Sequence, residues 1–278
     1  VVVSDTIIRG RDGEPTVSFS GPESAGCTLV GLTIQSATVG VSCRDAAPTI
    51  RSCVLENPDG IAIEYWHGQT PRLIDCTIVG QTKEGGDPGL VAYWKLDESG
   101  GAIVHDNEGD SHATIVGTPG WRPDDGQMGG AMEFDGACFV VTTLKLDPSS
   151  GPFSVHAWVC RGGPGQVILS QQMSQNWLMA DASTGALKAG LTDGGRLSRS
   201  LTSESVITDG DWHRISFVWD GSNRRLYVDG VLVAEDTQDS LKESSTNLIL
   251  GCGGSVTPGS FWTGLIDDVR IYDRAMQP

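Results

Sequence analysis

Basic residues are scarce in this chain of 278 residues. Nineteen Lys and Arg stand against 35 Asp and Glu, which gives a formal net charge of −16. Proteins that bind nucleic acid or anionic membranes need cationic surfaces, because these displace the counterions of phosphate groups. We therefore expect no nucleic-acid partner. No apolar run approaches the roughly 20 residues of a membrane-spanning helix, so no membrane insertion is expected either.

Common catalytic and metal motifs are also absent. The sequence has no GxSxG, GxGxxG, Walker A or HExxH pattern, so the usual nucleophile, nucleotide and zinc signatures are missing. Its seven cysteines include no CxxC pair, which favours buried free thiols over a zinc ribbon or a disulfide framework. The nearest glycosidase-like pattern, Glu133-Phe-Asp135, lacks a third carboxylate, and we expect a strand ending in a hairpin there.

Residues 1–82 repeat themselves with a period of about 20–24 residues, which is typical of a solenoid. The segments 28–34, 49–55 and 72–78 align at offsets of 21 and 23. A single repeat cannot bury its apolar face alone, so successive coils stack. The apolar columns expected to point inward are Leu29, Ile50 and Leu73, and Ile34, Leu55 and Ile78.

A third aligned column marks the bends between strands. It contains Gly31, Ser52 and Asp75, which are small or turn-forming residues. A further set of strands is predicted from the segments that begin at Gly40 and Gly60, 20 residues apart. Two short β-type runs per repeat are thus expected throughout this region.

The repeats 48–53 and 71–76 resemble the right-handed parallel β-helix family. The resemblance covers residues 1–82 and implies a fold without indicating a chemistry. Residues 83–89 are polar and rich in glycine, which is typical of a linker. The start at Val1, without a methionine, favours a segment of a longer protein in which the coils continue upstream.

Residues 90–278 contain short alternating strands separated by Asp-Gly, Gly-Gly and Pro-Gly turns. Asp229-Gly230, between the apolar runs 226–228 and 231–233, predicts a hairpin. About a dozen short strands without helical periodicity indicate an antiparallel two-sheet sandwich or jelly roll. The expected fold class is therefore all-β, with a short parallel β-helix segment followed by a jelly roll.

Six segments of this second region are similar, in order, to the laminin-G-like, concanavalin A-like family. They are 90–98, 129–136, 153–159, 211–221, 226–233 and 264–272. The resemblance implies a secreted or cell-surface location and a role in binding rather than catalysis.

The loop 106–110 is rich in oxygen-bearing side chains around a glycine, which suits a hard cation such as Ca²⁺. The resemblance implies a structural calcium ion between this loop and the last strand. The ligands implied are Asp106, Asn107, Asp267 and Asp268. The alternative is an acidic turn that is capped by local hydrogen bonds.

Sugar binding depends on exposed aromatic rings, because the C–H face of a pyranose stacks on tryptophan. Four of the eight tryptophans lie within strand motifs and are expected in the core: Trp94, Trp158, Trp212 and Trp219. Trp177 and Trp262 lie in polar segments and are candidates for the rim of a carbohydrate site, with Arg199 as a polar partner. Ordinary packing is the alternative for both tryptophans.

These features favour a non-catalytic extracellular module that recognises a polysaccharide or glycan, or that mediates cell adhesion, with a structural calcium ion. Two alternatives stay open. The chain is also compatible with the C-terminal part of a secreted β-helix polysaccharide lyase or glycosidase, in which the jelly roll targets the substrate. It is further compatible with a rigid surface spacer that binds other surface proteins.

Overall fold

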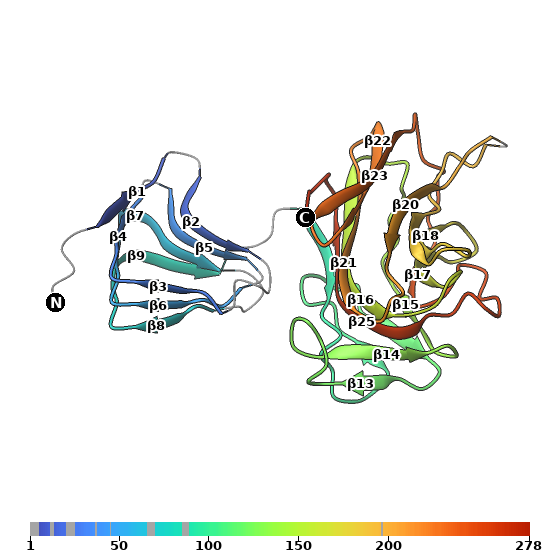
Figure 1. Cartoon of the computed structure of the whole chain (residues 1–278), viewed down its shortest axis with the longest axis horizontal. Coiled ribbons are helices and arrows are strands. Elements are labelled where there is room, and N and C mark those ends of the chain that lie inside the picture. Colours follow the sequence, from blue (N-terminus) through green and yellow to red (C-terminus); the bar gives the residue numbers. More distant parts are fainter. Residues whose placement is uncertain are drawn as a thin grey trace. The chain divides into compact units, whose positions relative to one another are not determined.

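The computed structural model describes residues 6–11, 14–20, 26–36, 38–44, 46–65, 70–84, 89–195 and 197–278. The chain divides into two compact units, Val1–Pro88 and Gly89–Pro278. Twenty-five strands lie in the described residues (Figure 1), and no helix there is long and apolar enough to cross a membrane. Residues 85–88 of the linker predicted at 83–89 lie outside the described residues.

The first unit is built from parallel strands. They are β1 (Ile7–Arg9), β2 (Pro15–Ser20), β3 (Thr28–Val30), β4 (Thr33–Gln35), β5 (Val39–Arg44), β6 (Thr49–Arg51), β7 (Val54–Tyr65), β8 (Arg72–Ile74) and β9 (Thr77–Glu84). One sheet has the order β1-β4-β7-β5-β2, with β9 also paired to β7, and the other has the order β3-β6-β8 (Figure 1). All of these pairs are parallel, which confirms the predicted β-helix coils.

The register of these coils confirms that the two apolar columns align, but the inward position predicted for Leu73 is wrong, because Leu73 lies on the edge strand β8 and is 39% exposed. Ile50 pairs with Leu29 on one side and with Leu73 on the other. In the second column, Leu55 pairs with Ile34 on one side and with Ile78 on the other. Ile50 and Leu55 are both fully buried in the core of this unit, because a neighbouring coil covers each of them on both sides.

The bend column is confirmed by the backbone. Gly31, Ser52 and Asp75 have φ angles of 67°, 52° and 51°. This left-handed conformation suits glycine best, and small or short polar residues tolerate it more readily than branched ones do. The sequence alignment therefore located the corner at which each coil changes direction.

The second set of strands in this unit has a different register from the predicted one. Val41 pairs with Ile63, 22 residues further along the chain, whereas the alignment of Gly40 with Gly60 predicted an offset of 20. The difference arises in an irregular stretch of β7. There the buried Asn57 amide donates hydrogen bonds to two main-chain carbonyl groups, at 2.9 and 3.1 Å.

The second unit is a sandwich of two eight-stranded antiparallel sheets. One sheet has the order β13-β14-β25-β16-β21-β22-β23, with β10 paired to β25. Its strands are β10 (Leu90–Trp94), β13 (Gly120–Arg122), β14 (Ala131–Asp135), β16 (Phe153–Arg161), β21 (Trp212–Trp219), β22 (Asn223–Val228), β23 (Val231–Thr237) and β25 (Thr263–Tyr272). We call it the first sheet of the sandwich.

The second sheet has the order β11-β12-β15-β24-β17-β18-β19-β20. Its strands are β11 (Ile103–Val104), β12 (Ala113–Val116), β15 (Phe139–Thr142), β17 (Val167–Gln171), β18 (Asn176–Ala180), β19 (Ala186–Ala189), β20 (Leu201–Val206) and β24 (Leu248–Leu250). The predicted Asp229-Gly230 hairpin joins β22 to β23, with φ angles of 52° and 78° at its two central residues.

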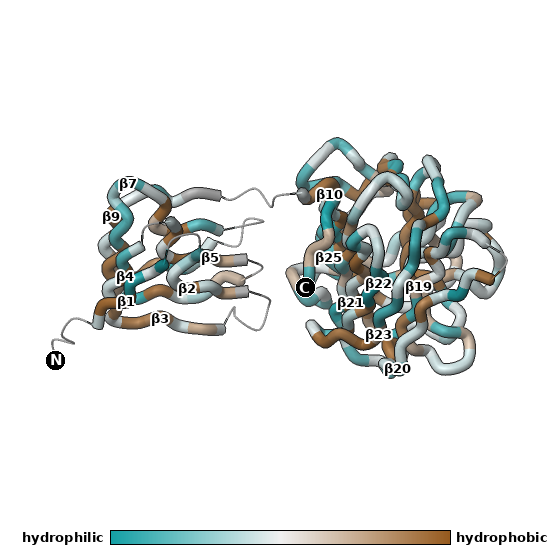
Figure 2. The backbone as a smooth tube through the Cα atoms, turned by 90° about the horizontal axis from the view of Figure 1, so that it is seen from above, coloured by the Kyte–Doolittle hydropathy of each residue, from teal (hydrophilic) through white to brown (hydrophobic). Residues whose placement is uncertain are grey.

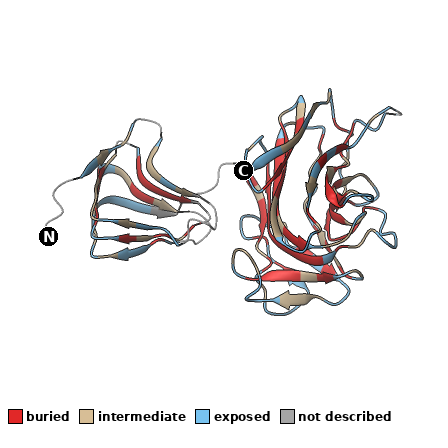
Figure 3. Ribbon diagram, viewed as in Figure 1, coloured by how far each residue is buried: buried red, intermediate tan, exposed pale blue. Residues whose placement is uncertain are grey.

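The core lies between these two sheets and contains side chains from both, such as Phe134, Phe217 and Leu178. Buried segments follow the strands of both sheets (Figure 3), and hydrophobic and hydrophilic residues are interspersed along them (Figure 2). In β21, Ile215 and Phe217 point into the core. Their neighbours at even positions therefore lie on the outer face of the first sheet.

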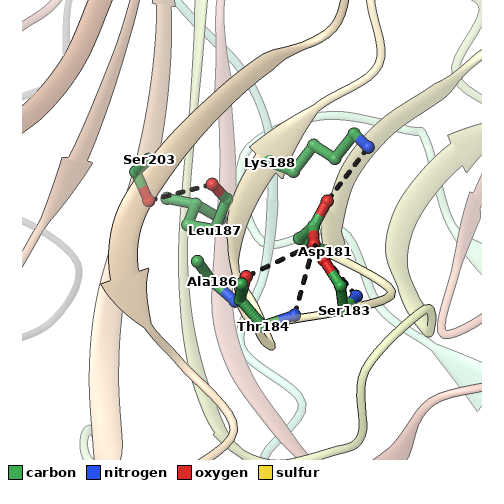
Figure 4. Close-up of polar contacts among 7 residues, drawn as sticks. All are labelled: Asp181, Ser183, Thr184, Ala186, Leu187, Lys188 and Ser203. Carbon is green, nitrogen blue, oxygen red and sulfur yellow. Dashed lines mark hydrogen bonds and ion pairs between the residues drawn. The ribbon is translucent and has the colours of Figure 1, made fainter.

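Asp181 stabilises the turn between β18 and β19. Its Oδ1 atom accepts hydrogen bonds from the Ser183 main-chain N–H at 3.0 Å and the Ser183 hydroxyl at 2.6 Å, and its Oδ2 atom lies 3.2 Å from Lys188 Nζ (Figure 4). The Ser183 hydrogen bonds, followed by that of Lys188, hold the pKa of Asp181 well below its usual value. The ionised carboxylate thus orders this turn.

Candidate functional site

Trp177 and Trp262 lie inside the sandwich, and the prediction that they stand at a rim is wrong. Both are 0% exposed. The Trp177 ring packs on Phe153, with centroids 5.1 Å apart, and the Trp262 ring lies directly against Gly162. Each residue belongs to the core between the two sheets, because its segment turns the ring inward despite its polar neighbours. A sugar cannot stack on a ring that has no exposed face.

Arg199 is exposed and lines a cavity of about 600 Å³, which we call the Arg199 cavity. The cavity lies between the loop that joins β19 to β20 and the strands β22 and β23. Its lining residues are Asp193, Gly195, Leu197, Ser198, Arg199, Arg224, Asp236 and Gln238. No tryptophan is among them, so the structure does not bring the three predicted sugar-binding residues together.

A different tryptophan lines a pocket. Trp212, at the start of β21, is half-buried and contributes to a pocket of about 340 Å³, which we call the Trp212 pocket. The other lining residues are Arg122, Asp125, Glu133, Cys160, Arg161 and Leu265. The indole packs on a small apolar cluster of this sheet, formed by Ala131, Cys160 and Leu265. This cluster is separate from the main core and lies on the outer face.

Glu133 connects two arginines in this pocket. Arg122 Nε donates to Glu133 Oε2 at 2.9 Å, and Arg161 Nη1 donates to Oε1 at 3.4 Å. The arginine side chains are 48% and 59% exposed, against 27% for Glu133. Because each guanidinium carries five N–H donors, both keep donors free for a ligand beside the indole ring.

Glu133 and Asp135 have different roles and do not act as a pair. Asp135 Oδ1 accepts hydrogen bonds from the main-chain N–H groups of Ala137 and Cys138, at 2.8 and 3.0 Å. The Asp135 carboxylate therefore caps the turn that follows β14. That turn leads to β15 in the opposite sheet, so the strand does end here, but the hairpin expected from the sequence is wrong.

Both carboxylate oxygens of Asp106 accept hydrogen bonds from nearby main-chain N–H groups. Its Oδ1 atom accepts a hydrogen bond from the Tyr93 main-chain N–H, and its Oδ2 atom accepts one from Ser111, both at 2.9 Å. The adjacent Asn107 is exposed. These contacts hold the loop 106–110 against β10, as expected for an acidic turn that is capped by local hydrogen bonds.

Asp267 and Asp268 are buried and have separate partners. Asp268 Oδ2 lies 2.8 Å from Arg270 Nη2, and Asp268 Oδ1 accepts a hydrogen bond from the Tyr93 hydroxyl. Asp267 Oδ2 accepts hydrogen bonds from two main-chain N–H groups of the β13–β14 turn, at 2.7 and 3.0 Å, whereas no described residue pairs with Oδ1. Burial, followed by the charge of Asp268, raises the pKa of Asp267 to about 8.

The four implied calcium ligands do not form a common cage in this arrangement. Ca²⁺ takes 6–8 oxygen ligands, and among the described residues no three His, Cys, Asp or Glu side chains converge to hold a metal. Asp106 and Asp268 already have hydrogen-bond or ion-pair partners, so Asp267 Oδ1 is the one carboxylate oxygen of these three residues for which no partner among the described residues is found. An ion bound by all four residues would require them to exchange these contacts, so calcium binding stays a prediction.

The comparison with protein families matches residues 135–278 to the model described as the concanavalin A-like lectin/glucanases superfamily. The chain belongs to this superfamily. The resemblance seen in the sequence is thereby confirmed, and we refer to the unit Gly89–Pro278 as the concanavalin A-like domain. No curated protein matches the chain in sequence.

Solved structures are similar to this chain at low sequence identity. The binding domain of Paraclostridial Mosquitocidal Protein 1 matches with a TM-score of 0.55 and 13% identity, over 68% of this chain and 49% of that chain. The receptor binding domain of botulinum neurotoxin D matches with a TM-score of 0.50 and 11% identity, over 68% and 50%. The match thus spans about half of each toxin chain. Domain 4 of AbnA, an arabinanase from Geobacillus stearothermophilus, matches with a TM-score of 0.45 and 21% identity, over 69% and 95%.

Of the four tryptophans predicted in the core, Trp94 and Trp219 are buried, whereas Trp158 and Trp212 are half-buried. The sequence does contain a signal for the outward position of Trp212. Strand β21 alternates, and Ile215 and Phe217 define its inward positions. Successive side chains of a strand point to opposite faces, so positions 217, 215 and 213 share the inward face. Trp212 therefore lies on the outward face. In the concanavalin A-like domain, alternation within the strand therefore indicates which face of the sheet a tryptophan occupies better than the polarity of the flanking segment does.

Proposed function

We propose that the concanavalin A-like domain is a non-catalytic, extracellular module that binds carbohydrate in the Trp212 pocket. The observation that carries this proposal is the half-buried Trp212 ring beside the Arg122–Glu133–Arg161 cluster in one pocket. Ligand sites of this kind combine an apolar wall with a few oriented polar groups. The indole supplies the wall on which the C–H face of a sugar ring stacks.

The polar cluster complements sugar hydroxyl groups. A hydroxyl both donates and accepts hydrogen bonds, and an arginine paired with a carboxylate presents donors next to an acceptor. Arg122 and Arg161 fix the Glu133 carboxylate from two sides. The groups are thus oriented before the ligand binds, which reduces the entropy lost on binding.

The competing function is hydrolysis, because Asp125 and Glu133 both line the pocket. Glycosidases use two carboxyl groups roughly 5–9.5 Å apart across the scissile bond. Binding is favoured because both Glu133 oxygens are already held by guanidinium groups, so neither is free as a nucleophile. Release of reducing ends from the polysaccharides tested below distinguishes hydrolysis from binding.

The structurally similar proteins support a binding role. Two of them carry the descriptions "binding domain" and "receptor binding domain", and a botulinum neurotoxin binding domain is described in complex with SialylT. These descriptions belong to those proteins. They are compatible with a recognition function for the same fold in this chain.

The test is a binding assay of the full chain against a glycan array and soluble polysaccharides, with Trp212→Ala and a matched control. Trp158→Ala is the control, since Trp158 is another half-buried tryptophan but does not line the pocket. We expect Trp212→Ala to weaken binding at least tenfold and Trp158→Ala to leave it unchanged. Equal binding by wild type and Trp212→Ala, or no binding by wild type, would refute the proposal.

A further inference from the structure

We infer that the Arg199 cavity is a second, independent carbohydrate site, so that the domain holds a polysaccharide at two points. The class of ligand depends on the proposed function, whereas the site itself rests on the cavity and its contacts. Its volume of about 600 Å³ exceeds the 340 Å³ of the Trp212 pocket, and both fall within or close to the usual range for small-molecule sites.

The cavity wall is held rigidly by Arg224. This residue is 1% exposed, and its guanidinium donates to the main-chain oxygens of Leu191 and, at 3.1 Å, Arg199. These oxygens lie at the two ends of the loop between β19 and β20. Arg224 Nε also donates to Asp236 Oδ1 on β23, at 2.9 Å. A buried guanidinium with these acceptors joins the two sheets and fixes the shape of the cavity before a ligand arrives.

Described residues of the same loop also contact one another. Asp193 Oδ1 accepts the main-chain N–H of Gly195 at 2.8 Å and the hydroxyl of Ser198. The turn leaves the Leu197 side chain at the cavity with 93% of its surface exposed. An apolar side chain beside polar groups is what the mixed surface of a sugar ring requires.

Unpaired polar groups complete the lining. Among the described residues, no side chain or main-chain group pairs with the Arg199 guanidinium or with the Gln238 amide. The guanidinium supplies donors, and the amide supplies both a donor and an acceptor. Among the described lining residues, Arg199 and Arg224 are basic and Asp193 and Asp236 are acidic, and Arg224 pairs with Asp236. Donors and acceptors thus stand side by side, which suits a ligand rich in hydroxyl groups.

The two sites lie far apart on the same domain. Trp212 begins β21, and Trp219 ends it and pairs with Arg224. Seven residues of strand separate these ends by roughly 23 Å. Accordingly, β13 and β14, which border the Trp212 pocket, and β22 and β23, which border the Arg199 cavity, lie at opposite ends of the domain in Figure 1. A disaccharide reaches one site only, whereas a polymer reaches both and gains avidity.

The stoichiometry of binding tests this inference. Calorimetric titration of the full chain uses a panel of cellobiose, maltose, lactose and xylobiose, followed by the corresponding soluble polymers. We expect two molecules of a bound disaccharide per wild-type chain, and one in Trp212→Ala, in Arg199→Ala and in Gln238→Ala. The control is Arg72→Ala, at an exposed arginine of the first unit. Affinity for the polymer is expected to fall at least tenfold in each single-site variant.

Two results separate the failure of this inference from the failure of the proposed function. One disaccharide per chain, lost in Trp212→Ala and unchanged in Arg199→Ala and Gln238→Ala, would overturn the second site and leave the proposed function standing. No binding of any disaccharide or polymer by wild type would overturn the proposed function itself. Because Ala at position 199 keeps the main-chain oxygen that Arg224 binds, unchanged thermal unfolding verifies that the loop is intact.

Discussion

Trp212 lies directly opposite Cys160 in the antiparallel pair of β21 and β16. This pairing places the indole on the outer face of the first sheet, while Ile215 of the same strand reaches the core between the sheets. The pocket beside it therefore consists of side chains from several adjacent strands. A site built on paired strands is held more rigidly than one built on loops alone.

Loss of the Glu133 carboxylate should weaken sugar binding without unfolding the domain. In Glu133→Ala, Arg122 and Arg161 lose the acceptor that orients them. We expect about a tenfold loss of affinity, equivalent to about 1.4 kcal/mol. Stability should change by about 1 kcal/mol or less, because the ion pairs are largely exposed. Calorimetry and thermal unfolding measure the two effects, with the exposed Asp124→Ala as control; a normal affinity in Glu133→Ala would contradict the assigned role.

Gly162→Ala should destabilise the domain more than Gly259→Ala does. Both glycines have similar φ angles, 81° and 86°. An added Cβ at Gly162 would collide with the ring of Trp262, whereas at Gly259 it would meet nothing within 4 Å. The two variants share the backbone strain and differ in the collision, which should add about 1–3 kcal/mol. Urea unfolding measures the difference, and equal losses would show that Trp262 is not packed there.

Arg224→Met should cost much more stability than Arg225→Met at the neighbouring position. Removal of the Arg224 guanidinium takes the donor from the buried Leu191 carbonyl oxygen and from the part-buried Arg199 carbonyl oxygen, and each buried acceptor left unsatisfied costs about 1–3 kcal/mol. Arg225 pairs with Asp220 and Glu235 at a more exposed position, where such pairs contribute about 1 kcal/mol or less. Chemical denaturation checks the contrast, and similar losses in both variants would contradict the clamp described for Arg224.

His213 should make stability dependent on pH. Burial lowers its pKa, but the hydrogen bonds to Asp229 and Asp209, at 2.8 and 3.0 Å, outweigh burial and raise the pKa above 6.5. A raised pKa in the folded state adds stability that is fully present below 6.5 and is lost as pH rises through the folded value. The gap in unfolding free energy between wild type and His213→Gln should therefore narrow from pH 6 to pH 9. A constant gap would contradict this prediction.

Calcium binding is tested separately from sugar binding. We expect Ca²⁺ to raise the midpoint of thermal unfolding of the chelator-treated chain. Asp267→Asn should abolish the effect, because Asp267 Oδ1 is a buried carboxylate oxygen that accepts no hydrogen bond from the described residues. Mg²⁺ at the same concentration is the control for ionic strength. An unchanged midpoint with Ca²⁺ would refute the predicted ion.

The sequence predicts the fold well where local chemistry decides it. Gly31, Ser52 and Asp75 align because each coil needs the same left-handed bend. Asp229-Gly230 predicts its hairpin because both positions require positive φ. The offset of β5 and β7 could not be predicted from two glycines, because it depends on the irregular stretch of β7 beside the buried Asn57.

The candidate site was harder to predict, since it depends on which strands become neighbours. Trp177 and Trp262 have polar sequence neighbours, yet both rings face the core. The residues that line the Trp212 pocket come from β13, β14, β16, β21 and β25. These strands are distant in the sequence, so no short motif predicts the pocket. The sequence indicates only that Trp212 lies on the outward face of its own strand.

The most direct test of the central claim is the indole N–H signal of Trp212 in a nitrogen–proton NMR titration of the full chain with the disaccharide panel. The signal is assigned by its loss in Trp212→Phe. The account predicts a saturable shift of this signal, while the signals of the buried Trp177 and Trp262 stay in place. The account is contradicted if a sugar binds and the Trp212 signal does not shift. It is also contradicted if no sugar of the panel binds.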